Sequence, residues 1–169
     1  MAVLETMSSR RQHMKIMKAN LVLTALALAA TAVATNVGAT QLNSNGSAFQ
    51  PYNASQATVI DYFGTGVRTI ASTPTYVVAS VDHNPSTSGQ TVFIDGTHSG
   101  SQTTTCSVLS YNYNGTILSS QSVNATAVSG AWERSVRFTP AQSTNWAYFS
   151  VLCLLPANGA GVLLGVAAS

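Results

Sequence analysis

Few side chains of this 169-residue sequence could carry acid–base or metal chemistry. From residue 40 onward, the charged side chains and the imidazoles are Asp61, Asp82, Asp95, Glu133, His83, His98, Arg68, Arg134 and Arg137. A glycosidase needs two carboxylates that flank the scissile bond, and none of these acids lies in a recognisable motif. A serine hydrolase would need a nucleophile context such as G-x-S-x-G, which the sequence lacks. We therefore predict that the protein is not an enzyme.

One arrangement of these residues could bind a metal ion. Asp82 and His83 end one expected strand, and Asp95 and His98 end the next one. If those two strands pair, two imidazoles and two carboxylates approach one another, and zinc accepts such ligands. Their spacing matches no established metal signature, and Asp is favoured in turns because its side chain bonds the local backbone. We predict turn residues here, with no metal site and no cofactor.

The aromatic residues are the better candidates for a binding site. Two tryptophans begin expected strands, and two tyrosines lie on strands near them, so the candidate ligand-binding residues are Trp132, Trp146, Tyr148 and Tyr111. Exposed aromatic patches mark interaction surfaces, and flat rings can stack on sugar rings. The alternative interpretation is that these rings form a second apolar layer or cap the ends of the fold.

The elements that must position these residues are strands. Apolar and polar residues alternate with a period of two, which predicts strands over 59–63, 75–81, 91–94, 105–111, 116–123, 132–138, 146–154 and 162–166. Asn114–Gly115 is typical of a type I′ hairpin turn, so 106–113 should pair antiparallel with 116–123. About eight short strands separated by turns predict an all-β fold, an antiparallel β-sandwich of immunoglobulin-like or jelly-roll topology.

The two cysteines, Cys106 and Cys153, predict one disulfide bond in an exported protein. Cys153 shares its side of the alternation with Phe149 and Val151, and Cys106 shares its side with Val108, so both sulfurs should face the core. Trp146 and Tyr148 have the opposite parity and should point outward. Residues 57–169 are the expected sandwich domain, after a loose arm or first edge strand over 40–56.

The amino-terminal residues indicate export. Four of the seven basic residues lie within the first 18 positions, and an apolar run rich in Ala and Leu follows over 19–34. Val37 and Ala39 place cleavage before Thr40, or an earlier pair places it before Thr35. This order predicts a removed signal peptide over 1–39 and a secreted or periplasmic protein. The alternative, a membrane-spanning helix, needs about 20 predominantly apolar residues. The mature chain should have no transmembrane anchor.

Charge excludes two classes of partner. Only 7% of all residues are charged, whereas 46% are hydrophobic, enough to build a core. From residue 40 onward, three arginines stand against four acids, a net charge of −1, and lysine is absent. The chain therefore lacks the basic surface that binds nucleic acid and the polybasic patch that binds an anionic membrane.

Several short motifs resemble those of a group of small, uncharacterised secreted proteins of proteobacteria. The likeness rests on Asp82–Pro85, Cys106–Ser110, the Asn114–Gly115 hairpin and Tyr148–Pro156. It implies an export leader before a β-rich domain, with a mid-chain Cys and a late Cys-x-x-Pro. Members often carry a Cys–Pro after an early strand, whereas this chain has Val78–Val81 and no Cys there, which implies that a second disulfide bridge has been lost. The resemblance brings no activity with it.

Two functional classes follow from the sequence. The first is an exported, non-enzymatic structural or interaction protein of unknown partner, and the alternative is a carbohydrate-binding or adhesin-like module that uses surface aromatics. An outward, clustered set of Trp132, Trp146 and Tyr148 would favour the second class. The uncharged segment 162–166, as an edge strand, could pair with another chain. The partner could be a glycan or a protein, and the oligomeric state is open.

Overall fold

The structure is a computed structural model that describes residues 42–83, 88–144 and 146–169, so the predicted signal peptide lies outside the described residues. It contains nine strands: β1 (Leu42–Asn45), β2 (Gln50–Pro51), β3 (Ile60–Phe63), β4 (Gly66–Thr69), β5 (Thr75–Val81), β6 (Gln90–Tyr111), β7 (Ile117–Phe138), β8 (Tyr148–Leu155) and β9 (Gly161–Ala168). Three short 3₁₀ helices connect them: η1 (Gly46–Ala48), η2 (Ala54–Val59) and η3 (Pro140–Gln142). Within the described part of the chain, no helix is long and apolar enough to span a membrane.

Strands β6 and β7 form one long hairpin that is bent in the middle. The sequence predicts four separate strands here, because the segment between 94 and 105 is rich in Gly, Ser and Thr. In the structure, pairing continues from Tyr111↔Ile117 to Gln90↔Phe138, with register shifts between His98 and Thr104. Glycines at positive φ lie at this point of both strands, at Gly100 and Gly130. Bulges and glycine let a strand turn a corner without ending.

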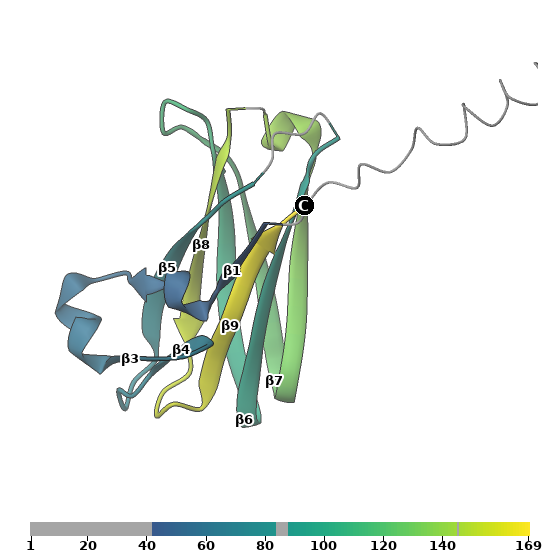
Figure 1. Ribbon diagram of the computed structural model, residues 1–169. Helices are drawn as coiled ribbons and strands as arrows, with labels where there is room; N and C mark the ends of the chain where they lie inside the picture. Colours follow the sequence, from purple (N-terminus) through teal and green to yellow (C-terminus); the bar gives the residue numbers. More distant parts are fainter. Residues whose placement is uncertain (1–41, 84–87, 145) are drawn as a thin grey trace, which may run out of the picture. The chain divides into compact units, whose positions relative to one another are not determined.

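The bend divides the antiparallel sheet into two layers. Strand β8 pairs with the second half of β6, over 105–111, whereas β9 pairs with the first half, over 92–98. One layer therefore contains β2, β5 and β8, and the other contains β9, β4, β1 and β3, with β6 and β7 running through both (Figure 1). The rings of Phe138 on β7 and Phe149 on β8 lie 5.1 Å apart across the core between the layers. The predicted antiparallel β-sandwich is confirmed.

The predicted hairpin pairing of 106–113 with 116–123 is confirmed, but its turn differs from type I′. Gly115 has a φ of +82°, whereas Asn114 does not have a positive φ. The Gly115 N–H donates to the carbonyl of Asn112, and the Asn112 N–H donates to the carbonyl of Thr116. This is a three-residue loop with glycine at the left-handed position, so only one residue with positive φ is required. Tyr113 lies at its exposed tip.

Two expectations from the sequence concern which segments lie at the edge of the sheet, and the pairing of distant strands tests both. The amino-terminal segment, expected as a loose arm or edge strand, forms β1 against β9 and β2 against β5. The expectation that 162–166 is an edge strand is wrong, because β9 pairs with β6 along one side and with β1 and β4 along the other. Its backbone groups are used within the sheet, so it offers no free edge for strand exchange.

The disulfide between Cys106 and Cys153 is confirmed, and it joins directly opposed residues of β6 and β8. Both cysteines are buried together with Val108, Phe149 and Val151, as the alternation predicts. The bond therefore cross-links two neighbouring strands of one layer from its inner face.

Substituting Gly96 should strongly destabilise the fold. A Cβ at this position would lie 2.2 Å from Cζ2 of Trp132 and 2.6 Å from the carbonyl oxygen of Val162, in the core. We expect Gly96→Ala to lower the free energy of unfolding by about 1–3 kcal/mol, the usual cost of overpacking. The matched control is Gly64→Ala, because no atom lies within 4 Å of its added Cβ. Urea unfolding of both variants gives the comparison, and equal stabilities would contradict the packing argument.

Candidate functional site

The outer face of the β5–β8–β6 layer is an uncharged surface that spans three neighbouring strands. Residues of odd number on β6 and of even number on β5 and β8 point away from the core. The outward residues are Tyr76, Val78, Ser80, Thr105, Ser107, Leu109, Tyr111, Tyr148, Ser150, Leu152 and Leu154. None of these side chains carries a charge. We call this surface the outer face.

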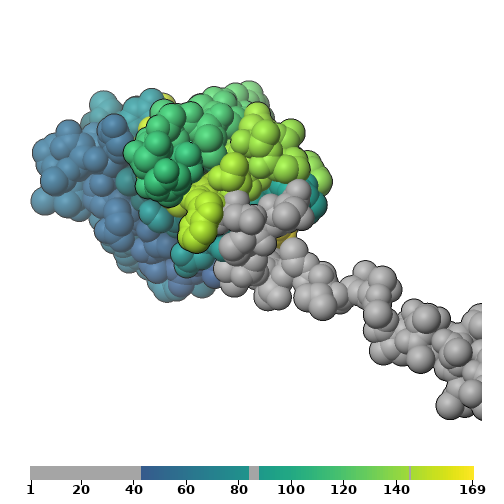
Figure 2. Space-filling model, turned by 90° about the horizontal axis from the view of Figure 1, so that it is seen from above, coloured from purple at the N-terminus to yellow at the C-terminus, as the bar shows by residue number. Residues whose placement is uncertain are grey.

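One end of the outer face carries a stacked aromatic pair. Tyr111 and Tyr148 are directly opposed on β6 and β8, and their rings are nearly parallel, at 11°, with centroids 5.1 Å apart. Trp146, just before β8, is 76% exposed, and Tyr148 is 45% exposed. The hairpin tip with Tyr113 and the residues that lead into β8 lie next to each other in the view onto this end (Figure 2). Three of the four predicted aromatic residues therefore present accessible rings at one end of the molecule.

Trp132, the fourth predicted residue, is not part of this surface. It is only 7% exposed, and it lies opposite Gly96 on the inner side of the other layer. Its ring packs 5.4 Å from the imidazole of His98. Trp132 shares the inward side of β7 with Val136 and Phe138, and the absence of a side chain at Gly96 leaves room for its indole. Trp132 is a core residue and cannot stack on an external ligand.

The charge around the outer face is low and acidic. No Lys or Arg lies on β5, β6 or β8. The three described arginines lie on β4 and β7: Arg68 pairs with Asp61, and Arg134 and Arg137 donate to backbone carbonyls. The exposed Asp82 follows the last residue of β5. The residues of the outer face themselves therefore supply no cation to pair with a carboxylate or sulfate group on a ligand.

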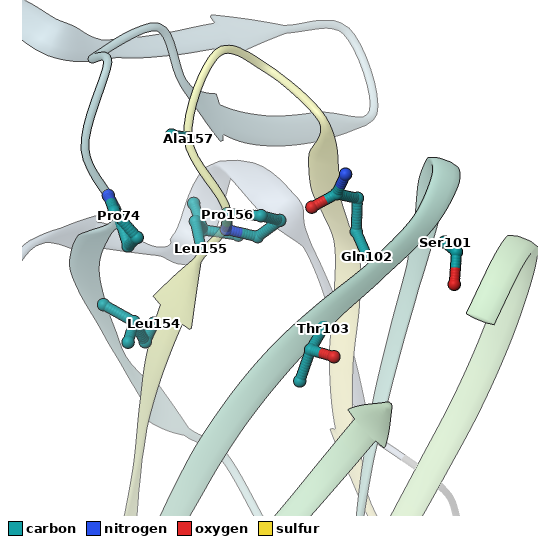
Figure 3. Close-up of a pocket in the computed structure, with 8 residues that line it drawn as sticks. All are labelled: Pro74, Ser101, Gln102, Thr103, Leu154, Leu155, Pro156 and Ala157. Carbon is teal, nitrogen blue, oxygen red and sulfur yellow. The ribbon is translucent and has the colours of Figure 1, made fainter. Parts of the chain in front are cut away.

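The opposite end of the outer face opens into a pocket of about 380 Å³. Leu154 of the outer face forms part of its wall, and Ser101, Gln102 and Thr103 approach from the corner of β6. Figure 3 shows the Gln102 side chain extending toward Pro156. The pocket combines an apolar wall with hydroxyl and amide groups, the usual composition of a small-ligand site.

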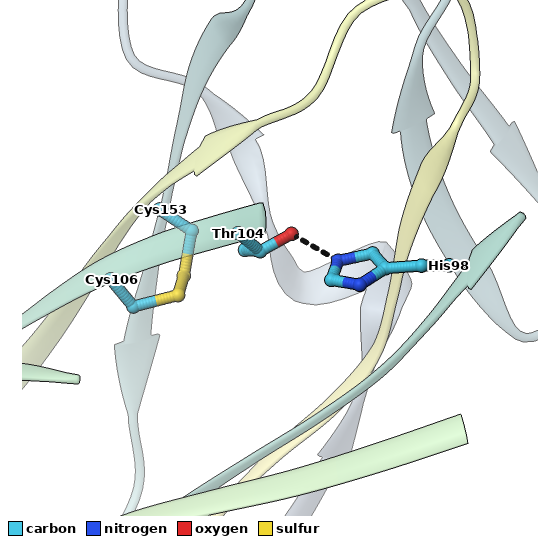
Figure 4. The surroundings of a disulfide bond; sticks show 4 residues. All are labelled: His98, Thr104, Cys106 and Cys153. Carbon is cyan, nitrogen blue, oxygen red and sulfur yellow. Dashed lines mark hydrogen bonds between the residues drawn. A yellow bond between two sulfur atoms is a disulfide. The ribbon is translucent and has the colours of Figure 1, made fainter. Parts of the chain in front are cut away.

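A buried histidine holds the corner that carries Gln102. The Nδ1 atom of His98 lies 3.0 Å from the carbonyl oxygen of Val128, and Nε2 lies 2.8 Å from Oγ1 of Thr104 (Figure 4). A carbonyl only accepts, so Nδ1 carries a proton and donates it, and Nε2 of that tautomer accepts from the threonine hydroxyl. His98 thus joins the residues before and after the bend, and the segment between them is fixed at both ends.

The structure does not assemble the possible metal ligands that the sequence contains. Among the described residues, no group of three or more His, Cys, Asp or Glu side chains could hold a metal ion. The two strands concerned are not neighbours, because β5 pairs with β2 and β8 rather than with the first half of β6. The His83 ring packs edge-on against Phe149, with centroids 4.9 Å apart. Burial lowers the pKa of His83, and this effect outweighs the negative charge of Asp82, which acts to raise it.

One pair of carboxylates does meet on the other layer, although no sequence motif marks it. Asp95 on β6 is directly opposed to Glu133 on β7. Burial, and then the charge of Glu133, raise the pKa of the Asp95 carboxyl. Asp95 also lines a groove of about 400 Å³ over Gly165 and Ala167, with Asn43 and Asn45 on its other side. Glu133 does not line this groove, so the geometry places one carboxylate at the groove rather than two.

Sequence reasoning missed the second aromatic pair of the outer face. Tyr76 pairs in register with Leu154, and its ring contacts that of Tyr52 edge-on, with centroids 6.3 Å apart. Both rings are exposed. The alternation within 75–81 already places Tyr76 on the outward side, so this signal was present. Its position beside Leu154 depends on the pairing of β5 with β8, which is non-local.

The comparisons bear on the fold. No protein-family model matches the sequence, and no curated protein matches it. Among solved structures, the chain is similar to a family 35 carbohydrate binding module from Clostridium thermocellum, at 12% identity and a TM-score of 0.52, over 77% of this chain and 98% of that one. It is also similar to the xylan-binding module CBM15, at 7% identity and a TM-score of 0.51, over 78% of this chain and 96% of that one. At these identities, the similarity shows a shared β-sandwich fold.

Proposed function

We propose that this protein is a non-catalytic, exported carbohydrate-binding protein that holds an uncharged glycan on its outer face. The observation that carries the proposal is the stacked pair of Tyr111 and Tyr148 at the end of an uncharged sheet surface, with the exposed Trp146 two positions before Tyr148 in the chain. Sugar rings present flat faces of C–H groups, and exposed aromatic rings offer a matching apolar surface with little entropy to lose.

Two further observations support this function over an unspecified structural role. The two solved structures named above are carbohydrate-binding modules, which supports the alternative of the sequence analysis rather than its main interpretation. The Ser and Thr hydroxyls between the aromatic pair and the pocket can exchange hydrogen bonds with sugar hydroxyls. The disulfide fits an oxidising compartment, where extracellular and periplasmic glycans are met.

The test is binding to a panel of polysaccharides. We would use affinity electrophoresis and pull-down with uncharged polymers (xylan, cellulose, mannan) and acidic ones (polygalacturonate, alginate). We expect saturable binding to at least one uncharged polymer and none to the acidic ones, because Asp82 and the absence of Lys and Arg disfavour anions. Trp146→Ala should weaken that binding about tenfold, which corresponds to roughly 1.4 kcal/mol. Absence of binding across the panel, or binding to acidic polymers alone, would refute the proposal.

A further inference from the structure

We propose that the pocket at the corner of β6 is a second subsite of the outer face, and that one extended, uncharged oligosaccharide lies along β8 between this pocket and the tyrosine pair. This inference rests on the proposed function and specifies the length of the ligand. It distinguishes an oligosaccharide chain from a single sugar held only at the tyrosines.

The spacing of residues on β8 sets the length of the chain. Tyr148 carries the aromatic pair and Leu154 forms a wall of the pocket, and both belong to the outward side of the same strand. Leu154 lies six positions after Tyr148, which at about 3.3 Å per residue is about 20 Å. Ser150 and Leu152 lie between them on the same side, without a charged residue. This span exceeds a disaccharide, so a ligand that contacts both ends must contain several sugar units.

The chemistry of the pocket suits one unit of such a chain. Its volume of about 380 Å³ lies within the range of small-ligand sites. Pro74, Leu154 and Pro156 supply apolar walls, and the Gln102 amide supplies two donors and an acceptor for sugar hydroxyls. No charged residue lines this pocket, so it matches the tyrosine end in selecting an uncharged ligand.

The backbone around Gln102 is built to hold its side chain in this position. Register shifts of the β6–β7 ladder lie on both sides of Gln102, between His98 and Gln102 and between Gln102 and Thr104. Such irregularities re-aim a side chain that would otherwise follow the alternation. The hydrogen bonds of His98 to Val128 and Thr104 fix the corner from inside. Little ordering of the subsite is therefore needed on binding, which favours affinity.

The experiment is calorimetric titration of the disulfide-bonded protein with xylo-, cello- and manno-oligosaccharides, from the disaccharide to the hexasaccharide. We expect affinity for the preferred series to rise at least about tenfold from the disaccharide to the hexasaccharide. A tenfold rise is what one or two additional hydrogen bonds to the ligand would give. Gln102→Leu should bring the hexasaccharide affinity down to the disaccharide value. Ala157→Phe, which fills the pocket, should act in the same way. Gln56→Leu on η2 is the matched control and should bind like the unmodified protein.

The outcomes separate this inference from the function on which it rests. Disaccharide and hexasaccharide bound equally well by the unmodified protein, or a rise with length that persists in Gln102→Leu, would overturn the second subsite while leaving glycan binding at the tyrosines intact. Failure of every oligosaccharide and every polysaccharide to bind the folded protein would overturn both proposals. Length-dependent affinity that Gln102→Leu and Ala157→Phe both abolish would establish the subsite.

Discussion

Replacement of both stacked tyrosines, Tyr111→Ala with Tyr148→Ala, is expected to reduce glycan affinity by at least about thirtyfold. Aromatic residues at the centre of an interface commonly contribute about 2 kcal/mol or more when truncated, which is about thirtyfold in the dissociation constant. Here the two rings stack against each other on neighbouring strands, so the double variant removes both rings of the pair at once. Calorimetric titration with the preferred oligosaccharide measures the loss.

Two control variants make this result specific. Tyr148→Phe keeps the ring and should retain most of the affinity, since the proposal assigns stacking to the ring rather than to the hydroxyl. Tyr62→Ala removes a similarly exposed tyrosine from β3, in the other layer, and should bind normally. Thermal unfolding by circular dichroism checks that each variant is folded. Normal binding by the folded double variant would place the glycan elsewhere on the molecule.

Loss of the disulfide is expected to lower the free energy of unfolding by about 4 kcal/mol. The bond joins residues 47 positions apart, and the chain-entropy model gives about this value for a loop of that length. Cys106→Ala with Cys153→Ala is the appropriate variant, because both positions are buried and alanine introduces no unsatisfied polar group. Urea unfolding of the double variant and of the oxidised protein measures the difference.

The reduced protein provides the internal comparison for this second prediction. Unfolding in excess dithiothreitol should give nearly the stability of the double alanine variant, because both lack the same cross-link. A loss below about 1 kcal/mol in both cases would show that β6 and β8 are held by their ladder and core contacts alone. Since the bond lies on the inner face, oligosaccharide affinity of the folded fraction should not change.

Local patterning predicts much of the fold because a strand's side chains alternate with a period of two, whatever pairs with it. This alone places Tyr148 and Trp146 outside and Cys106 and Cys153 in the core, and both results agree with the structure. Asn114–Gly115 likewise locates the hairpin from local sequence, because a turn is specified by the few residues within it. The all-β class follows from the number of such segments.

The site required information that no short segment contains. Trp132 and Trp146 are equivalent candidates in the sequence analysis. In the structure, Trp132 shares the buried side of β7 with Val136 and Phe138, and the register against β6 places it opposite Gly96. The corner in β6 also cannot be predicted from the local sequence. A Ser- and Thr-rich stretch is predicted as a loop when the strand that pairs with it is unknown.

The sequence by itself determined that this protein is an antiparallel sandwich with one buried disulfide, little charge and outward aromatic side chains. Only the tertiary structure decided that Tyr111 lies against Tyr148, that β9 is an inner strand, and that Gln102 lines a pocket at the far end of the same strand. The physical reason is that side-chain alternation is a local property of the backbone. Which strands become neighbours depends instead on burying apolar faces from distant parts of the chain, and a shift of one register position would move every side chain to the other face.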